Sequence, residues 1–149
     1  MKRFLLSFAI LSMFFVISSQ AQVFTENNIG GPTYMFVLSA QSGTMKDDTL
    51  TLKGVPTVVY FSDRPARIAG HKSMKDFEGL WNNSSDSFKA DPPNATLSIM
   101  KEDGATNVVV ELISMKHDGD LCTFKIRVLE GNPPETFGAA SLFVDDIEI

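Results

Sequence analysis

The chain has 149 residues, with 13 basic and 18 acidic side chains, a net charge of −5 and a single cysteine. A chain this acidic lacks the clustered lysines and arginines that phosphate binding needs, which excludes a nucleic-acid partner and disfavours anionic membrane surfaces. No apolar run reaches the roughly 18 residues needed to span a membrane. The length is that of one domain with one core.

The first 21 residues have the pattern of a cleavable export signal. A short cationic start precedes an apolar run over residues 4–17, and the small residues Ser19 and Ala21 lie just before the expected cleavage between Ala21 and Gln22. Cleavage leaves about 128 residues and a net charge of about −7, because two basic residues leave with the signal. We therefore expect a soluble periplasmic or extracellular protein, with no transmembrane segment in the mature chain.

The mature chain is expected to begin with a polar, glycine-rich arm over residues 22–32 and to continue as a single β-rich domain over residues 33–149. Three strands are predicted in the first part of this domain. Residues 34–38 are aromatic and branched and are expected to be buried on both faces. Residues 49–53 alternate strictly between apolar and polar side chains, and residues 57–61 form the third strand. A turn composition separates the first two strands.

One helix is predicted, over residues 73–81, and Ser73 can cap its N-terminus. Apolar side chains recur with helical spacing along one side of it, at Met74, Phe77, Leu80 and Trp81. About two turns of helix are not stable alone, so we expect the helix to pack on the sheet with Trp81 as its anchor. The following loop, residues 82–94, is long and interrupted by prolines, and Phe88 is expected to fix its middle to the core.

The last third of the chain carries the clearest strand pattern. Strands are predicted over residues 95–99, 107–116, 122–128 and 140–144. The third of these alternates, with one apolar face made by Cys122, Phe124, Ile126 and Val128. About seven strands, one short helix and frequent turns predict a mainly β fold, as a single antiparallel β-sandwich or flattened barrel.

Candidate residues for thiol or metal chemistry are few. Cys122 lies in an apolar register, so we expect a core thiol and not a nucleophile, and a lone cysteine forms no intrachain disulfide. His71 and His117 alone cannot build a zinc site, and His117 falls in a predicted turn where it should be exposed. We expect no metal and no cofactor, with calcium as the alternative. Its ligands would come from Asp86, Asp91, Asp145, Asp146 and Glu148.

The densest polar cluster lies between the third strand and the helix, over residues 62–71. Its candidate ligand-binding residues are Asp63, Arg64, Arg67 and His71, and the loop 82–94 adds Asp86 and Asp91. Arginine binds carboxylates and other anions through paired hydrogen bonds, which suits a binding site. Such a cluster is more often structural, in which case Asp63 pairs with Arg64 or Arg67 and His71 is simply exposed, but it remains our first choice for a site.

The common motifs of hydrolases, phosphate-binding loops and metalloproteases are absent from the sequence, so no single chemistry is indicated. Three functions fit the features described above. The favoured interpretation is an exported, non-enzymatic binding or interaction module that uses the two loops to hold a small molecule or an envelope protein. The second is a small hydrolase or lyase with His71 as base, supported by Asp63, Arg64 and Arg67. The third is a structural envelope component.

A set of motifs extends over nearly the whole mature chain. These motifs occupy residues 49–55, 60–65, 67–71, 86–88, 91–95 and 140–145, with the sequence YFSDRPARIAGH at 60–71. On these motifs the chain resembles an uncharacterised family of exported proteins found in bacteria and some algae. The resemblance implies no activity, cofactor or catalytic residue. It implies only that the turn around Asp63 and His71 and the loop around Asp86 matter for function.

Overall fold

The computed structural model describes residues 31–82 and 88–148, with side chains described as far as residue 145. The predicted export signal, most of the predicted arm and Asp86 lie outside the described residues. The chain is mainly β and antiparallel with one short helix, as predicted. The elements in chain order are β1 (Thr33–Ala40), β2 (Ser42–Lys46), β3 (Thr49–Lys53), β4 (Val58–Ser62), β5 (Ala69–Lys72), α1 (Met74–Glu78), the 3-10 turn η1 (Gly79–Trp81), β6 (Asn94–Lys101), β7 (Gly104–Asp118), β8 (Leu121–Glu130), β9 (Thr136–Phe137) and β10 (Ala140–Glu148).

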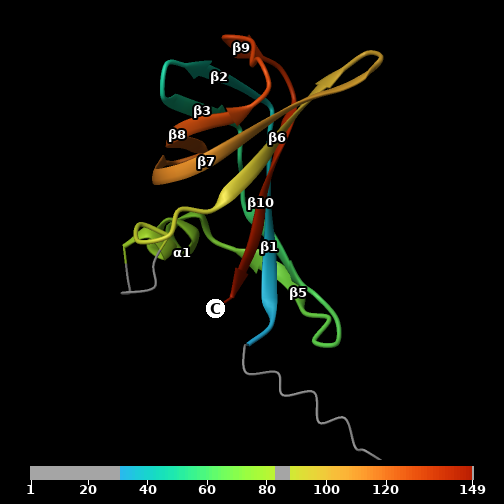
Figure 1. Cartoon of the computed structure of the whole chain (residues 1–149), viewed down its shortest axis with the longest axis vertical. Coiled ribbons are helices and arrows are strands. Elements are labelled where there is room, and N and C mark those ends of the chain that lie inside the picture. Colours follow the sequence, from blue (N-terminus) through green and yellow to red (C-terminus); the bar gives the residue numbers. More distant parts are fainter. Residues whose placement is uncertain (1–30, 83–87, 149) are drawn as a thin grey trace, which may run out of the picture.

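All ten strands belong to one sheet, in the order β5-β4-β1-β10-β6-β7-β8-β3-β2-β9. In this order β1 and β2 are six places apart, yet only Gln41 separates them in the chain, so the sheet must curl until they meet. Figure 1 shows β1 and β10 running along the long axis, with β2, β3 and β8 gathered at one end. The sheet is not closed into a barrel, because the edge strands β5 and β9 do not pair with each other in the described chain.

Three strands, β2, β5 and β9, were not predicted, which explains the difference between about seven expected strands and the ten observed. Gly43 is typical of a turn but lies in β2, because the ring of Phe137 packs against it. A Cβ at Gly43 would come within 2.5 Å of that ring. Gly70 of β5 similarly faces Tyr60, whose hydroxyl would lie 3.0 Å from a Cβ. Both glycines therefore permit close packing within a strand and do not interrupt it.

The inner face of the curled sheet forms the core. Cys122, Phe124 and Ile126 of β8 point into it, as the alternation predicts, and are at most 2% exposed. Val128 was expected beside them but is 39% exposed. The reason is that β3 pairs with β8 only as far as Lys125, so in the described chain Val128 has no paired strand beside it on that side.

The predicted helix packs against this core. Its cap is confirmed, since Oγ of Ser73 accepts the N–H of Asp76 at 3.1 Å. The buried indole of Trp81 donates from Nε1 to the carbonyl of Leu112 at 3.1 Å, which anchors the helical segment to β7. Phe88 is buried with its ring 4.8 Å from that of Trp81, so it fixes its loop to the core as expected.

Candidate functional site

The predicted site at residues 62–71 folds as the turn and second strand of a β4–β5 hairpin. The N–H of Ser62 donates to the carbonyl of Ile68, and the N–H of Ile68 donates to Oγ of Ser62, both at 2.8 Å. Within the turn, the N–H of Arg67 donates to the carbonyl of Asp63 at 3.1 Å, and Arg67 has a positive φ of 51°. The turn is held by its backbone and one hydroxyl, so its charged side chains are not needed to close it.

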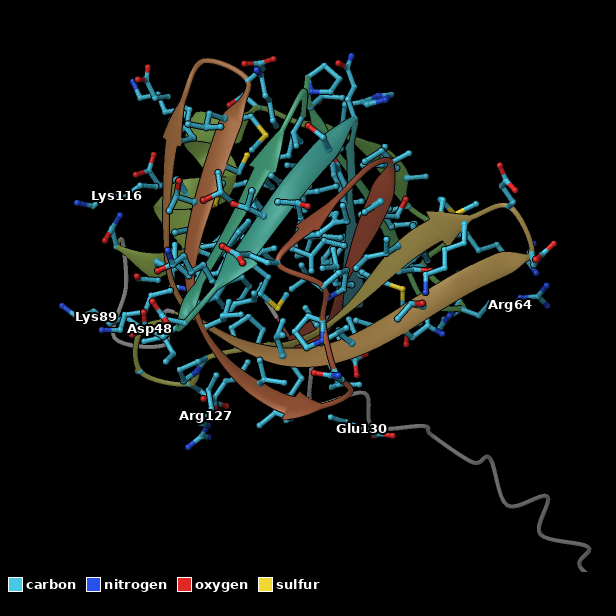
Figure 2. All side chains as sticks on the ribbon, turned by 90° about the horizontal axis from the view of Figure 1, so that it is seen from above. Asp48, Arg64, Lys89, Lys116, Arg127 and Glu130 are labelled. Atoms are coloured by element: carbon cyan, nitrogen blue, oxygen red, sulfur yellow. The ribbon has the colours of Figure 1, made fainter. Side chains whose placement is uncertain are left out.

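Both arginines of this turn are exposed. In the described part of the chain neither forms an ion pair with a carboxylate, so the expected pairing of Asp63 with an arginine is not formed. Figure 2 shows Arg64 at the periphery of the molecule, with its side chain directed away from the ribbon. The turn therefore presents two arginines to solvent without assembling them around a common point.

The expected partners of a catalytic pair, His71 and Asp63, lie at different levels of the hairpin. His71 stands opposite Val59 of β4. Asp63 lies four positions beyond Val59, which at roughly 3.3 Å per residue is about 13 Å along the strand direction. Both side chains are exposed, and no hydrogen bond joins them in the described chain. The structure therefore does not bring together the base and the carboxylate that a hydrolase would use.

The second predicted loop is fixed where it enters β6. The N–H of Leu112 donates to the carbonyl of Pro93 at 2.9 Å, and Pro93 itself is buried. Asp91 is exposed, and Asp86 lies outside the described residues. Asn94, the first residue of β6, is exposed on the sheet face opposite the core.

This second face, which we call the outer face, carries an apolar row across several neighbouring strands. The strand register aligns Val59, Val37, Phe143, Thr96 and Val109 on β4, β1, β10, β6 and β7. Val59 and Phe143 are each 39% exposed. Antiparallel sheets that are solvated on one face normally present polar side chains there, so this row is unusual for a face in contact with water.

Two open cavities adjoin on the outer face. One of about 260 Å³ lies over β10, β6 and β7, and the other, of about 310 Å³, lies over β4 and the start of β1. Met35 and Asp145 line both cavities, so the two form one depression, which we call the outer-face groove. Its lining residues are Thr33, Met35, Phe61, Ser62, Asp63, Asn94, Ala95, Thr96, Val109, Phe143 and Asp145.

The outer-face groove extends from one predicted loop to the other. Asp63 borders one end, where its N–H donates to the carbonyl of Thr33 at 3.2 Å and holds the turn against the start of β1. Asn94 borders the other end. Of the predicted ligand-binding residues that the structure describes, Asp63 alone lines the groove. Those that do not are Arg64, Arg67, His71 and Asp91.

The sequence reasoning missed the floor of the groove. Met35, Phe61 and Phe143 come from three adjacent strands, and no local pattern links residues so distant in the chain. One signal did point to them, namely that residues 34–38 are apolar on both faces. The structure buries the inner side chains of that segment but leaves the outer ones half-buried.

The charge inside the groove is negative. Asp63 and Asp145 are the charged side chains among its described lining residues, and no lysine, arginine or histidine lines it. Carboxylates are thus the bases beside its hydroxyl groups, and the described lining offers no histidine or lysine for that role. In residues 31–82 and 88–148, no group of three or more histidine, cysteine or acidic side chains could hold a metal ion. The chemistry of this surface suits binding of a partly apolar, positively charged group.

A second polar cluster joins α1 to the β7–β8 hairpin. Nδ1 of His117 and Oε2 of Glu78 are in hydrogen-bonding contact, with side chains 24% and 25% exposed, so His117 is not the exposed turn residue expected. Cys122 stands opposite His117 and is fully buried. Burial, followed by the negative charges of Asp120 and Glu78, raises the pKa of this thiol from 9.0 to about 12. Cys122 is therefore a neutral core residue, as predicted, and not a nucleophile.

Comparisons with known proteins give no relative: no protein-family model, characterised protein or solved structure matches the chain. The similarity of its motifs to an exported family thus stays a prediction. Among the helices of the described residues, none combines the length and the apolar character that crossing a membrane requires.

Proposed function

We propose that the protein is an exported, non-enzymatic binding module, and that its binding surface is the outer-face groove between the turn at 62–71 and the end of the loop at 82–94. The observation that carries this proposal is the composition of β1. Its outer side chains Met35 and Val37 are apolar and half-buried, and Met35 lines both cavities of the groove. Contiguous exposed apolar surface rimmed by polar residues is typical of interaction sites.

The apolar side chains of the outer face supply part of the energy for binding. Phe61 and Phe143 of the groove, and Val59 beside it, are each 39% exposed. Covering the remaining exposed area of such a side chain contributes on the order of 1 kcal/mol, because full burial of one is worth about 1.5–3 kcal/mol. Together they contribute about 3 kcal/mol, which is less than a millimolar complex requires, so polar contacts at the rim must supply the rest.

The catalytic alternative has weaker support. A hydrolase or lyase needs His71 within hydrogen-bonding reach of its orienting carboxylate. The hairpin places Asp63 about 13 Å away along the strand, at roughly 3.3 Å per residue. The groove itself also contains no histidine. A structural envelope component is the remaining alternative, and self-association would distinguish it.

A capture experiment with the native envelope fraction tests the proposal. The immobilised protein is compared with the double variant Phe61→Ser, Phe143→Ser and with a control, Leu121→Ser, Leu129→Ser, which changes two exposed apolar residues of β8 away from the groove. We expect the groove variant to lose bound components that the wild type and the control retain. Equal capture by all three proteins would contradict a binding role for this face.

A further inference from the structure

The sheet has an open edge at β5. Among the described strands, β5 pairs with β4 alone. The N–H of Ser62 donates to the carbonyl of Ile68 across the hairpin, so every second residue from Ile68 onward, including Gly70, bonds to β4. The backbone groups of the residues between them, Ala69 and His71, therefore point away from β4. Within residues 31–82 and 88–148, no backbone hydrogen bond reaches this side of β5.

The hairpin that carries this edge is basic, although the protein is acidic. Residues 62–72 hold three lysine or arginine side chains and one aspartate, a net charge of +2. The other residues hold 10 basic and 17 acidic side chains, a net charge of −7. Nζ of Lys72 lies 5.9 Å from the centre of the Tyr60 ring, so this cation has a contact within the hairpin. Arg64 and Arg67 form no ion pair with any described carboxylate.

The length of the basic segment matches that of a short added strand. Arg67 lies two residues before Ala69, the first residue of β5, so six residues separate the arginine turn from the end of the strand, counting both ends. A partner strand would lie about 4.8 Å from β5, a distance that an arginine side chain can cross. Ile68, between Arg67 and the strand, is 40% exposed and offers an apolar contact.

Charge selects the partner for this edge. An open edge accepts an extended segment through backbone hydrogen bonds whatever its sequence, and side chains then give specificity. Carboxylates accept paired hydrogen bonds from arginine, so an acidic segment gains contacts that a neutral or basic one does not. Pairing of β5 with β5 of a second copy would bring two hairpins of net charge +2 together, which is unfavourable.

We propose that the open edge of β5 accepts an extended acidic segment of another protein as an added strand, and that carboxylates of this segment contact Arg64 and Arg67. The site is distinct from the outer-face groove, because neither arginine lines its cavities. It therefore goes beyond the proposed function and gives the exposed arginines a role that needs no common point between them, since an extended chain meets them one after the other.

Four synthetic octapeptides test this proposal by isothermal titration calorimetry at physiological salt. Three are acetylated and amidated, share threonine at alternate positions, and hold Glu, Gln or Lys at the positions between. The fourth is the Glu peptide with N-methyl groups on two adjacent central residues, which removes a donor from each of its edges. We expect the Glu peptide to bind about tenfold tighter than the Gln peptide, the Lys peptide to bind weakest, and the methylated peptide not to bind.

The charge variant Arg64→Gln, Arg67→Gln should bind the Glu peptide no tighter than the Gln peptide. It should fold, because backbone bonds and the hydroxyl of Ser62 close the turn. The matched control Lys89→Gln, Lys116→Gln removes the same charge from exposed residues that Figure 2 shows on the other side of the molecule from Arg64. This control should retain the preference for Glu.

The edge variant Ala69→Pro removes an N–H that β4 does not use, and should abolish binding of every peptide. It also provides a test should the charge variant fail to fold. Equal binding of the Glu, Gln and Lys peptides, or binding of none, would overturn the acidic partner. Unchanged binding of the methylated peptide would overturn strand addition. Self-association in sedimentation velocity that Ala69→Pro abolishes would identify a second copy as the occupant and overturn the proposal.

Discussion

The two faces of β1 have similar compositions and different surroundings. On the inner face, Phe36 and Leu38 are at most 1% exposed, and the ring of Phe36 lies 5.2 Å from that of Phe77 on the helix. On the outer face, Met35 and Val37 are only half-buried. The comparison shows that apolar side chains along a strand predict that the strand is covered, but not whether the cover comes from the same chain or from another molecule. The inner contact is made within the chain, and we propose that the outer one is made with another molecule.

The largest expected difference is in the free energy of unfolding of variants at Phe36 and Val37, which are neighbours on β1. Replacing Phe36 with Ala should lower the free energy of unfolding by about 3–5 kcal/mol, because it leaves a cavity among the buried rings. Replacing Val37 with Ala should cost less than about 1 kcal/mol, because its side chain borders solvent. Urea denaturation of both variants measures the difference. Similar losses for the two would mean that the outer face is part of the core.

The next effect concerns the buried thiol of the inner face. The pKa of Cys122 is raised from 9.0 to about 12, so the thiol stays protonated in the folded state after it has ionised in the unfolded state. Stability is therefore unaffected below pH 9 and falls as the pH rises from 9 toward 12, by about 2 kcal/mol at pH 10.5. Denaturation at pH 8 and pH 10.5 measures this loss. In the variant Cys122→Ala, the part of the loss that comes from the thiol should disappear. An equal pH dependence in that variant would show that the thiol is not responsible.

A smaller effect concerns the helix that packs on the inner face. Ser73→Ala removes the oxygen that accepts the N–H of Asp76 and should destabilise the protein by about 1 kcal/mol. Ser141→Ala, on the outer face of β10, should change stability by less than about 0.5 kcal/mol. Thermal unfolding of the two variants compares a residue that supports the core with one that does not.

The sequence predicted the parts of the fold that depend on local alternation. The strand at residues 49–53 has the predicted bounds, and the capped helix with Trp81 as its anchor is confirmed. It did not predict β2 or β5, because each contains a glycine that is typical of a turn. Gly43 and Gly70 lie in strands because the rings of Phe137 and Tyr60 pack on them. Such contacts between distant segments leave no periodic pattern.

The sequence also predicted only part of the candidate site. Asp63 was identified and does line the groove. Phe143 was missed, and Asp145 was considered only as a calcium ligand, because both reach this surface through the pairing of β1 with β10, whose partners are 100 or more residues apart in the chain. Arg64 and Arg67 drew attention as a dense charge cluster, yet no contact in the described chain brings them together.

The central claim is that the outer face binds and the inner face stabilises, and one double variant tests it most directly. Phe61→Ser, Phe143→Ser removes two rings that are each 39% exposed. Its free energy of unfolding and its capture of components from the native envelope fraction are measured side by side. We expect the variant to remain folded, with a loss of stability of about 1–2 kcal/mol per ring because part of each ring is already covered, and to lose the components that the wild type captures. A folded variant that captures these components as well as the wild type would contradict the account.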